Sequence, residues 1–248
     1  MDVSNAFLHS ELDEEIYMSL PQGYTPAPGV TLPPNPSESD TSLFIKSSPT
    51  SFIAVLVYVD DIAIASNNDG DLKALKSLLS GAFRIKDLGP MRFFLGLEIA
   101  PSSSGISISQ RKYTLDLLQD NGLLACKPAC VPMDPYVQLT TETGVALSSP
   151  RPYRKLIGRL LYLKITRPDI TFAVHKLSQY LQAPTDAHMQ VALRVLKYLK
   201  ANPGQGLFYS STSKLCLNAF ADADWATCRD SRISVTGFCV YLGTSLIC

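Results

Sequence analysis

The sequence predicts an α+β fold, in which antiparallel strands and helices occupy separate stretches of the chain. Apolar runs suited to strands occur at residues 52–66 and again at residues 91–110. Apolar residues at helical spacing fill residues 151–201, and strand-like segments return from residue 215. Strands followed by a run of helices are typical of the α+β class.

The composition is that of an ordinary soluble globular protein. The chain has 248 residues, of which 46% are hydrophobic and 18% charged, enough for one large domain or two small ones. No apolar run approaches the about 20 residues of a membrane span, and residues 1–20 lack the features of a signal peptide. The six cysteines form no paired CxxC sets. We therefore expect reduced thiols, no zinc site and no membrane contact.

The balanced net charge hides two oppositely charged segments. Residues 1–50 contain one lysine against seven acidic residues. Residues 151–200 contain two acidic residues and ten basic ones: Arg151, Arg154, Lys155, Arg159, Lys164, Arg167, Lys176, Arg194, Lys197 and Lys200. An acidic segment that binds cations and a basic segment that binds phosphates suit a nucleic-acid enzyme. Taken alone, the basic segment also suits a solvated helix face.

The first elements are strands separated by a linker. Residues 2–8 suit a strand end and a turn, and residues 10–24 a short acidic amphipathic segment. Residues 25–42 contain five prolines and no regular period, which predicts a loop or linker. The stretch "FIAVLVYVDDIAIAS" at residues 52–66 predicts two strands joined at Val59–Asp61, although Asp-Asp is not a turn that hairpins favour.

Helices and strands then alternate. Asp71 suits the N-cap of a helix whose apolar residues share one face: Leu72, Leu75, Leu78, Leu79 and Phe83. Residues 91–100 and 105–110 predict a second antiparallel pair. Residues 112–121 predict a helix that Gly122 ends.

The second half of the chain predicts a helical block followed by strands. Helices are expected at residues 151–165, 168–182 and 185–201, and the starts of the last two are marked by Pro168 and Pro184–Thr185. Strands are expected at residues 215–222 and 234–243. The final "TSLIC" stops within an apolar pattern, so we expect that the chain is cut there.

Asp60 and Asp61 suggest metal chemistry, because adjacent carboxylates repel each other unless a cation lies between them. A two-metal polymerase site needs carboxylates from separate strands around two Mg²⁺ ions, which prefer oxygen ligands. A hairpin tip with this pair beside a strand that carries Asp2 would meet that need. We expect no lysine or arginine near the three acids, which favours a metal site over a mere turn. A solvated turn is the alternative.

Four motifs occur in an order that resembles a known family. They are "DVSNAFL" from Asp2, "YVDDI" from Tyr58, "FRIKDLG" from Phe83 and "FFLGLEI" from Phe93. Together they closely resemble motifs A, C, D and E of reverse transcriptases from plant Ty1/copia-type LTR retrotransposons. The likeness continues through the predicted helices. It then reaches "AFADADWATCRDSRISVTGFCVYLG", which is similar to the start of the RNase H domain of the same polyproteins.

The resemblance implies a polymerase site. Asp2, Asp60 and Asp61 match the catalytic acids, which bind Mg²⁺ or Mn²⁺. Phe7 matches the aromatic gate that excludes a 2′-hydroxyl group from the incoming nucleotide, and Ala6 lies beside it in the same nucleotide-binding segment.

The resemblance also implies a set of residues that hold the primer. Separately, it implies a metal-binding acid in the RNase H-like segment. The primer-binding positions are matched by Tyr58, Val59, Phe94, Leu95 and Gly96. By themselves, Phe94 and Leu95 would suggest core packing. In the tail, Asp222 matches the first metal-binding acid of RNase H, although Asp224 could take that place, and Trp225 is expected to pack.

These matches imply an architecture and partners. The expected parts are a motif A fragment (1–24), a proline-rich linker (25–42), a partial polymerase palm of antiparallel sheet with helices (43–110), a helical thumb or connection region (111–210) and a truncated RNase H-like start (211–248). The partners would be an RNA template, a DNA primer and a dNTP, and no membrane contact is expected. The resemblance does not fix the oligomeric state. The location would be cytoplasmic virus-like particles or the nucleus.

The sequence departs from the family between motifs A and C. There the family carries motif B, typically "LYGLKQA", and this chain has only the linker. The segments before motif A and the later RNase H acids are also missing from the sequence. We therefore expect a fragment of an RNA-directed DNA polymerase that is inactive by itself. The alternatives are a non-catalytic nucleic-acid-binding remnant, in which Asp60 is dispensable, and a product without function.

Overall fold

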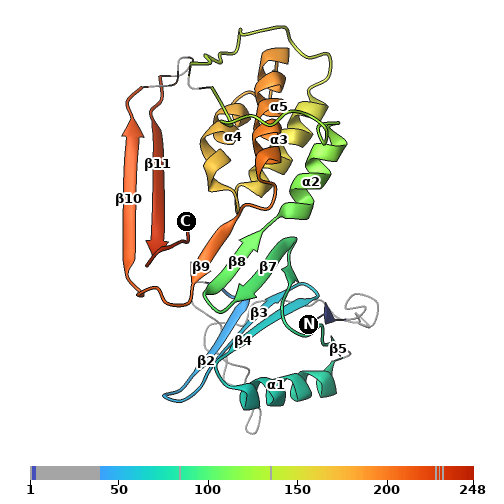
Figure 1. Cartoon of the computed structure of the whole chain (residues 1–248), viewed down its shortest axis with the longest axis vertical. Coiled ribbons are helices and arrows are strands. Elements are labelled where there is room, and N and C mark those ends of the chain that lie inside the picture. The colour runs from blue at the N-terminus through green and yellow to red at the C-terminus, as the bar shows by residue number, and fades with distance from the viewer. Residues whose placement is uncertain are drawn as a thin grey trace, which may run out of the picture. The chain divides into compact units, whose positions relative to one another are not determined.

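The computed structural model describes residues 2–3, 40–83, 85–134, 136–226, 228, 230 and 232–248 (Figure 1). The chain divides into two compact units, residues 1–94 and residues 95–248. Both contain antiparallel sheets and helices, so the predicted combination of these elements is confirmed. No helix within the described ranges is long and apolar enough to cross a membrane. The expected acidic segment and most of the linker lie outside these ranges.

The first unit contains a five-stranded antiparallel sheet. Its strands lie in the order β2 (Leu43–Ser47), β3 (Phe52–Tyr58), β4 (Asp61–Ser66), β1 (Asp2–Val3) and β5 (Ile85–Lys86). Strands β3 and β4 form the predicted hairpin. Ile53 and Val55, two residues apart, are the buried residues of β3, as expected for a strand with one face toward a core.

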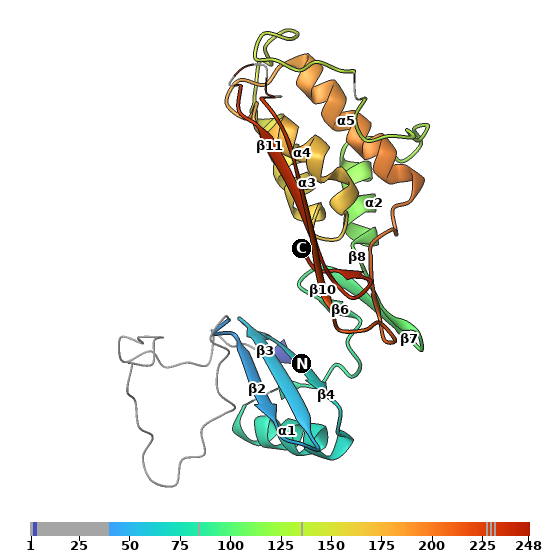
Figure 2. The same ribbon diagram turned by 90° about the vertical axis from the view of Figure 1, so that its left-hand side faces the viewer.

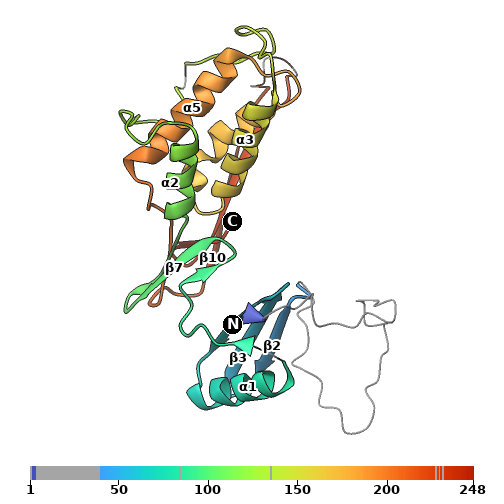
Figure 3. The same cartoon turned by 90° about the vertical axis from the view of Figure 1, so that its right-hand side faces the viewer.

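Helix α1 (Asp69–Ala82) packs against β4 and β5, along one side of this sheet (Figures 2 and 3). Its N-cap is Asn68 rather than the predicted Asp71, because the Asn68 side-chain oxygen accepts from the N–H of Gly70 (2.8 Å) and that of Asp71 (3.4 Å). The apolar face is also narrower than predicted. Leu78 is 67% exposed, since it is rotated by about 100° around the helix axis from Leu79. Phe83, beyond the helix end, is exposed as well.

The second unit begins with the predicted strand pair. Strand β6 (Phe93–Phe94) ends the first unit, and β7 (Leu97–Ser102) and β8 (Gly105–Ser109) form an antiparallel hairpin. Strand β9 (Leu207–Ser210) returns to pair with β8 on its other side. The chain therefore leaves this sheet for the helices and comes back next to its point of exit (Figure 1). Glycine is needed at Gly206, because a Cβ atom there would lie 2.0 Å from the Ile108 carbonyl oxygen.

Between β8 and β9 lie α2 (Arg111–Asp120), α3 (Arg151–Leu163), the 3-10 helix η1 (Pro168–Ile170), α4 (Thr171–Ser178) and α5 (Asp186–Ala201). They share a core whose fully buried residues include Tyr153, Ile157, Leu160, Ile170, Val174, Leu177, Val195 and Leu196. Gly122, with a φ of 67°, ends α2 as predicted. The predicted helix at 168–182 is wrong in its bounds. Pro168 opens a 3-10 turn, and α4 ends early because Tyr180 turns into the core, where its hydroxyl donates to the Leu139 carbonyl.

The last sheet is antiparallel, in the order β10 (Leu217–Asp224), β11 (Val235–Leu242) and β12 (Ser245–Leu246). This confirms the two strands predicted in this segment. All of β10 is exposed, because it packs closely against β11 alone among the described elements. The prediction that Trp225 packs is wrong for the part of the chain that the structure describes. Trp225 follows this exposed strand and is itself 90% exposed.

Candidate functional site

The two adjacent acids lie at the tip of the β3–β4 hairpin. Tyr58 pairs with Asp61, so Val59 and Asp60 form a two-residue loop. Val59 has a φ of 52°, whereas φ is not positive at Asp60. This pattern is that of a type II′ turn, which usually has glycine at its first loop position. The Asp-Asp hairpin is possible because the unfavourable φ falls on Val59, at the cost of strain in a β-branched residue.

The strand register brings the third predicted acid to this hairpin. Asp2 of β1 is the Cα partner of Asp61, and on its other side Asp2 pairs with Lys86 of β5. A single row across the sheet therefore contains Tyr58, Asp61, Asp2 and Lys86. Lys86 corrects the expectation that no basic residue lies near the acids. It is visible in "FRIKDLG", but only the pairing of β5 with β1 places it in this row.

The donor chemistry of this row fits a hard divalent cation. Asp60 is exposed and Asp61 half-buried, and within the described side chains neither carboxylate forms an ion pair. Their oxygens are ligands that Mg²⁺ and Mn²⁺ prefer. The side chains that the structure describes contain no cluster of three or more acids, histidines or cysteines arranged around a metal. The support for a metal is thus the carboxylate pair and the register of Asp2.

Tyr58 and Val59 expose apolar side chains at the same tip. They are 54% and 60% exposed, although they end a strand whose middle is buried. Neither is needed for the core of the first unit. Both are therefore accessible to a ligand at the hairpin tip.

A second turn carries the other residues expected to hold a primer. Phe94 ends β6 and is half-buried, and Leu95 (φ 49°) and Gly96 (φ 75°) follow with consecutive positive φ values, the pattern of a type I′ turn. The Leu95 carbonyl accepts a hydrogen bond of 2.6 Å from the Tyr162 hydroxyl. Sequence reasoning missed Tyr162, because "LLYL" within a helical pattern indicates only a core.

The basic residues of segment 151–200 fall into two groups, those that bond to other parts of the fold and those without a described partner. Three of its residues support the fold: Arg154 donates to the carbonyls of Leu181 and Gln182, Lys200 to those of Leu124 and Cys126, and Arg159 pairs with Asp120. Six have no side-chain hydrogen bond or ion pair to any described residue: Arg151, Lys155, Lys164, Lys176, Arg194 and Lys197. The lysines of this second group, with Arg151, suit phosphate contacts.

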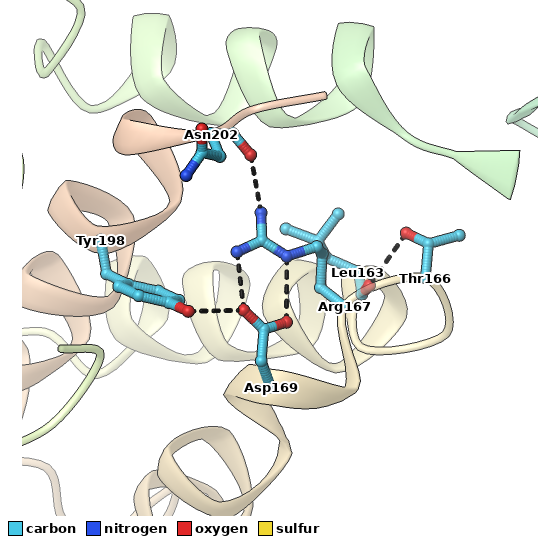
Figure 4. Close-up of polar contacts among 6 residues, drawn as sticks. All are labelled: Leu163, Thr166, Arg167, Asp169, Tyr198 and Asn202. Carbon is cyan, nitrogen blue, oxygen red and sulfur yellow. Dashed lines mark hydrogen bonds and ion pairs between the residues drawn. The ribbon is translucent and has the colours of Figure 1, made fainter. Parts of the chain in front are cut away.

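Arg167 corrects the view of the segment as one phosphate-binding face. It is 2% exposed, and Figure 4 shows its guanidinium enclosed by polar groups. Nε and Nη2 donate to the carboxylate of Asp169 (3.0 and 2.7 Å), and Nη1 donates to the Asn202 carbonyl (2.9 Å). The Tyr198 hydroxyl also donates to Asp169 (2.8 Å). Burial by itself raises the pKa of Asp169, but the hydrogen bonds from Arg167 and Tyr198 outweigh it and lower that pKa overall.

The remaining predicted residues are not brought together with these. Asp222 and Asp224 lie two residues apart on β10 and are exposed, and the Asp222 carboxylate accepts from the N–H of Ala223 (2.9 Å). No third metal-ligating side chain joins them among the described residues. Ala6 and Phe7 lie outside the described residues.

Comparisons with known proteins agree on one family. The family described as "Reverse transcriptase (RNA-dependent DNA polymerase)" matches residues 30–135. The chain is 39% identical to the retrovirus-related Pol polyprotein from transposon RE2 of Arabidopsis thaliana, over 98% of this chain and 19% of that protein. It is 31% identical to that from transposon TNT 1-94 of Nicotiana tabacum, over 96% and 21%. The chain thus spans about a fifth of the length of these polyproteins.

A shorter relative matches almost from end to end. The chain is 30% identical to a putative transposon Ty5-1 protein of Saccharomyces cerevisiae, over 98% of this chain and 89% of that protein. The alignment with the RE2 polyprotein extends over 272 residues, more than the 248 of this chain, so that relative has residues without a counterpart here. No solved structure matches the chain significantly.

Proposed function

The chain belongs to the reverse transcriptase family of Ty1/copia-type retrotransposon Pol polyproteins, and from this we propose that it is a segment of an RNA-directed DNA polymerase that binds a template–primer duplex but does not extend the primer by itself. One observation carries the polymerase assignment: the row that pairs Asp61 with Asp2 beside the Val59–Asp60 turn. Two-metal nucleotidyl transfer needs carboxylates that converge from separate strands.

In this proposal, Asp2, Asp60 and Asp61 hold Mg²⁺ or Mn²⁺. When bound, the two ions would lower the pKa of the primer 3′-hydroxyl group and stabilise charge on the transferred phosphoryl group. The chain's own residues position the substrates. Tyr58 and Val59 contact the primer end from the exposed hairpin tip, and Phe7, with Ala6 beside it, excludes a nucleotide that has a 2′-hydroxyl group.

We assign the parts of the chain accordingly. Residues 43–110 form a partial palm, residues 111–210 a thumb or connection region, and residues 211–248 the start of an RNase H-like domain with Asp222 as its first acid. The unpartnered lysines of the helices, such as Lys155 and Lys176, neutralise backbone phosphates of the duplex. Their lack of partners among the described residues supports this role.

The expected lack of extension rests on the interval between Asp2 and Asp60. In the family this interval contains the motif B helix, which contacts the template and the nucleotide. In this chain it contains residues 25–42, whose five prolines are incompatible with such a helix. The greater length of the alignment with the RE2 polyprotein is consistent with missing residues.

Binding without catalysis is the second candidate function, and the unpartnered basic side chains favour it. In that case the acids have no role, and a metal is not required. The two candidates differ in their response to the loss of Asp60 and Asp61.

The test combines two measurements on the full chain. Duplex binding is followed by fluorescence anisotropy, and primer extension on an RNA template is assayed with Mg²⁺ or Mn²⁺. We expect binding without extension, and stronger binding when Mg²⁺ is present in the wild type but not in Asp60→Asn/Asp61→Asn. If the wild type extended the primer and the double variant did not, the proposal that the chain is inactive by itself would be wrong. A folded wild type that does not bind the duplex would overturn the proposed function.

A further inference from the structure

The Leu95–Gly96 turn has a backbone that its sequence does not favour. Leu95 has a φ of 49°, a region that residues with a Cβ atom rarely adopt, and Gly96 has a φ of 75°. Such outliers persist where the surrounding structure holds them, and they cluster at functional sites. The contacts of this turn therefore decide whether it keeps its conformation.

Tyr162 of α3 contacts both residues of the turn. Its hydroxyl donates to the Leu95 carbonyl at 2.6 Å, a short and therefore well-formed hydrogen bond. A Cβ atom on Gly96 would lie 2.9 Å from the same hydroxyl oxygen, so the tyrosine occupies the space that a larger residue would need. One side chain thus bonds to the carbonyl of the first residue and lies close to the second, whose positive φ favours glycine.

The ring of Tyr162 is itself held by two helices. It packs edge-on against Tyr113 of α2, with ring centroids 5.2 Å apart. The Arg159 guanidinium lies 5.4 Å from the centre of the Tyr113 ring, and the Tyr113 hydroxyl donates to the Arg159 carbonyl (3.3 Å). Tyr162 is only partly buried. Its hydroxyl therefore reaches the turn from a ring that packs against Tyr113, and the residue adds little to the helical core.

We propose that Tyr162 is a positioning residue for the primer, whose hydroxyl hydrogen bond to Leu95 holds the Leu95–Gly96 turn in the conformation that receives the primer end. This inference rests on the proposed function, because it requires a bound template–primer. It assigns to the "LLYL" segment a role beyond packing. It also explains why a strained leucine is tolerated at this position.

The test uses a matched pair of tyrosines. Tyr162→Phe removes the hydroxyl that bonds to the turn, whereas Tyr113→Phe removes one that bonds only within the helices. Each full-length variant is bound to an RNA–DNA template–primer with a photoreactive 4-thiothymidine at the primer 3′ end. The yield of cross-links to residues 93–97 is measured by mass spectrometry, together with duplex affinity and thermal stability.

We expect Tyr162→Phe to lower the cross-link yield by about five-fold, the factor typical of losing one hydrogen bond, with nearly unchanged duplex affinity and a small loss of thermal stability. Tyr113→Phe should leave the yield unchanged. Gly96→Ala should also lower the yield, because alanine is strained at the positive φ of this position. Equal yields in wild type and Tyr162→Phe, or equal losses in both tyrosine variants, would overturn the proposal. Absence of duplex binding by the wild type would instead overturn the proposed function, and this inference with it.

Discussion

Val59 is the residue whose backbone makes the acidic hairpin possible. A positive φ in a β-branched residue is unfavourable, and asparagine tolerates that region much better. Val59→Asn should therefore raise the free energy of unfolding of the first unit by about 1 kcal/mol. Urea denaturation followed by circular dichroism would measure this change.

The matched control is Val57→Asn. Val57 lies in β3 and lacks a positive φ, so asparagine gains nothing there and loses strand propensity. We expect this variant to be less stable than the wild type. If both variants were destabilised to the same extent, strain at Val59 would not be a property of the folded protein.

His188 couples the stability of the second unit to pH. Its Nδ1 accepts from the N–H of Thr185 (3.0 Å), so Nε2 carries the proton and donates to the Thr140 carbonyl (3.2 Å). Burial lowers the pKa of His188 below its usual 6.5, although the bond to Thr140 and the carboxylates of Asp230 and Asp186 oppose this in part. A lowered folded-state pKa means that the unfolded chain takes up the proton first as the pH falls.

The free energy of unfolding should therefore decrease as the pH falls below about 6.5. Chemical denaturation between pH 5.5 and pH 7.5 would measure it. His188→Gln should flatten this dependence, and His175→Gln, at an exposed position, is the matched control. A wild type more stable at pH 5.5 than at pH 7.5 would refute the neutral state of His188.

Among the helices, the pair of Arg167 and Asp169 links η1 to the end of α5 through Tyr198 and Asn202. Arg167→Met would leave the Asp169 carboxylate without its main partner. We expect the free energy of unfolding to fall by about 3 kcal/mol, as when one partner of a largely buried ion pair is removed. Arg154→Met removes hydrogen bonds without leaving a charge unpaired, so about 1 kcal/mol is expected there. Thermal and urea unfolding would show whether the two variants differ in this order.

Elements with local signals could be predicted from the sequence. The apolar run of β3, the glycine at Gly122 and the Pro184–Thr185 start of α5 each act within a few residues. The early end of α4 could not be predicted, because Tyr180 turns toward a carbonyl 41 residues away. The same holds for the candidate site. Adjacent carboxylates mark Asp60 and Asp61, whereas Lys86 and Tyr162 acquire their positions only from tertiary pairing.

Across the molecule, some lysines are expected to bind phosphates, whereas others stabilise the fold. Lys155→Gln/Lys164→Gln/Lys176→Gln should weaken duplex binding and reduce the slope of log Kd against log salt by about 1 per lost phosphate contact, with little change in stability. Lys200→Gln should lower the stability and leave the salt slope of duplex binding nearly unchanged, because Lys200 bonds to two backbone carbonyls. Salt titrations of binding and melting curves would separate the two effects. An unchanged slope in the triple variant would contradict the phosphate contacts.

The return of β9 to the side of β8 has a mechanical consequence. Strands β7 and β9 flank β8 and run in the same direction, so Leu97 and Ser210 lie at opposite ends of this sheet. A pulling force that enters at Leu97 and leaves at Ser210 would shear the strands past one another, and many hydrogen bonds would have to break together. The helices between β8 and β9 lie off this path of force. A chain stretched between these two points would thus keep its helical region folded until strands β7, β8 and β9 separate.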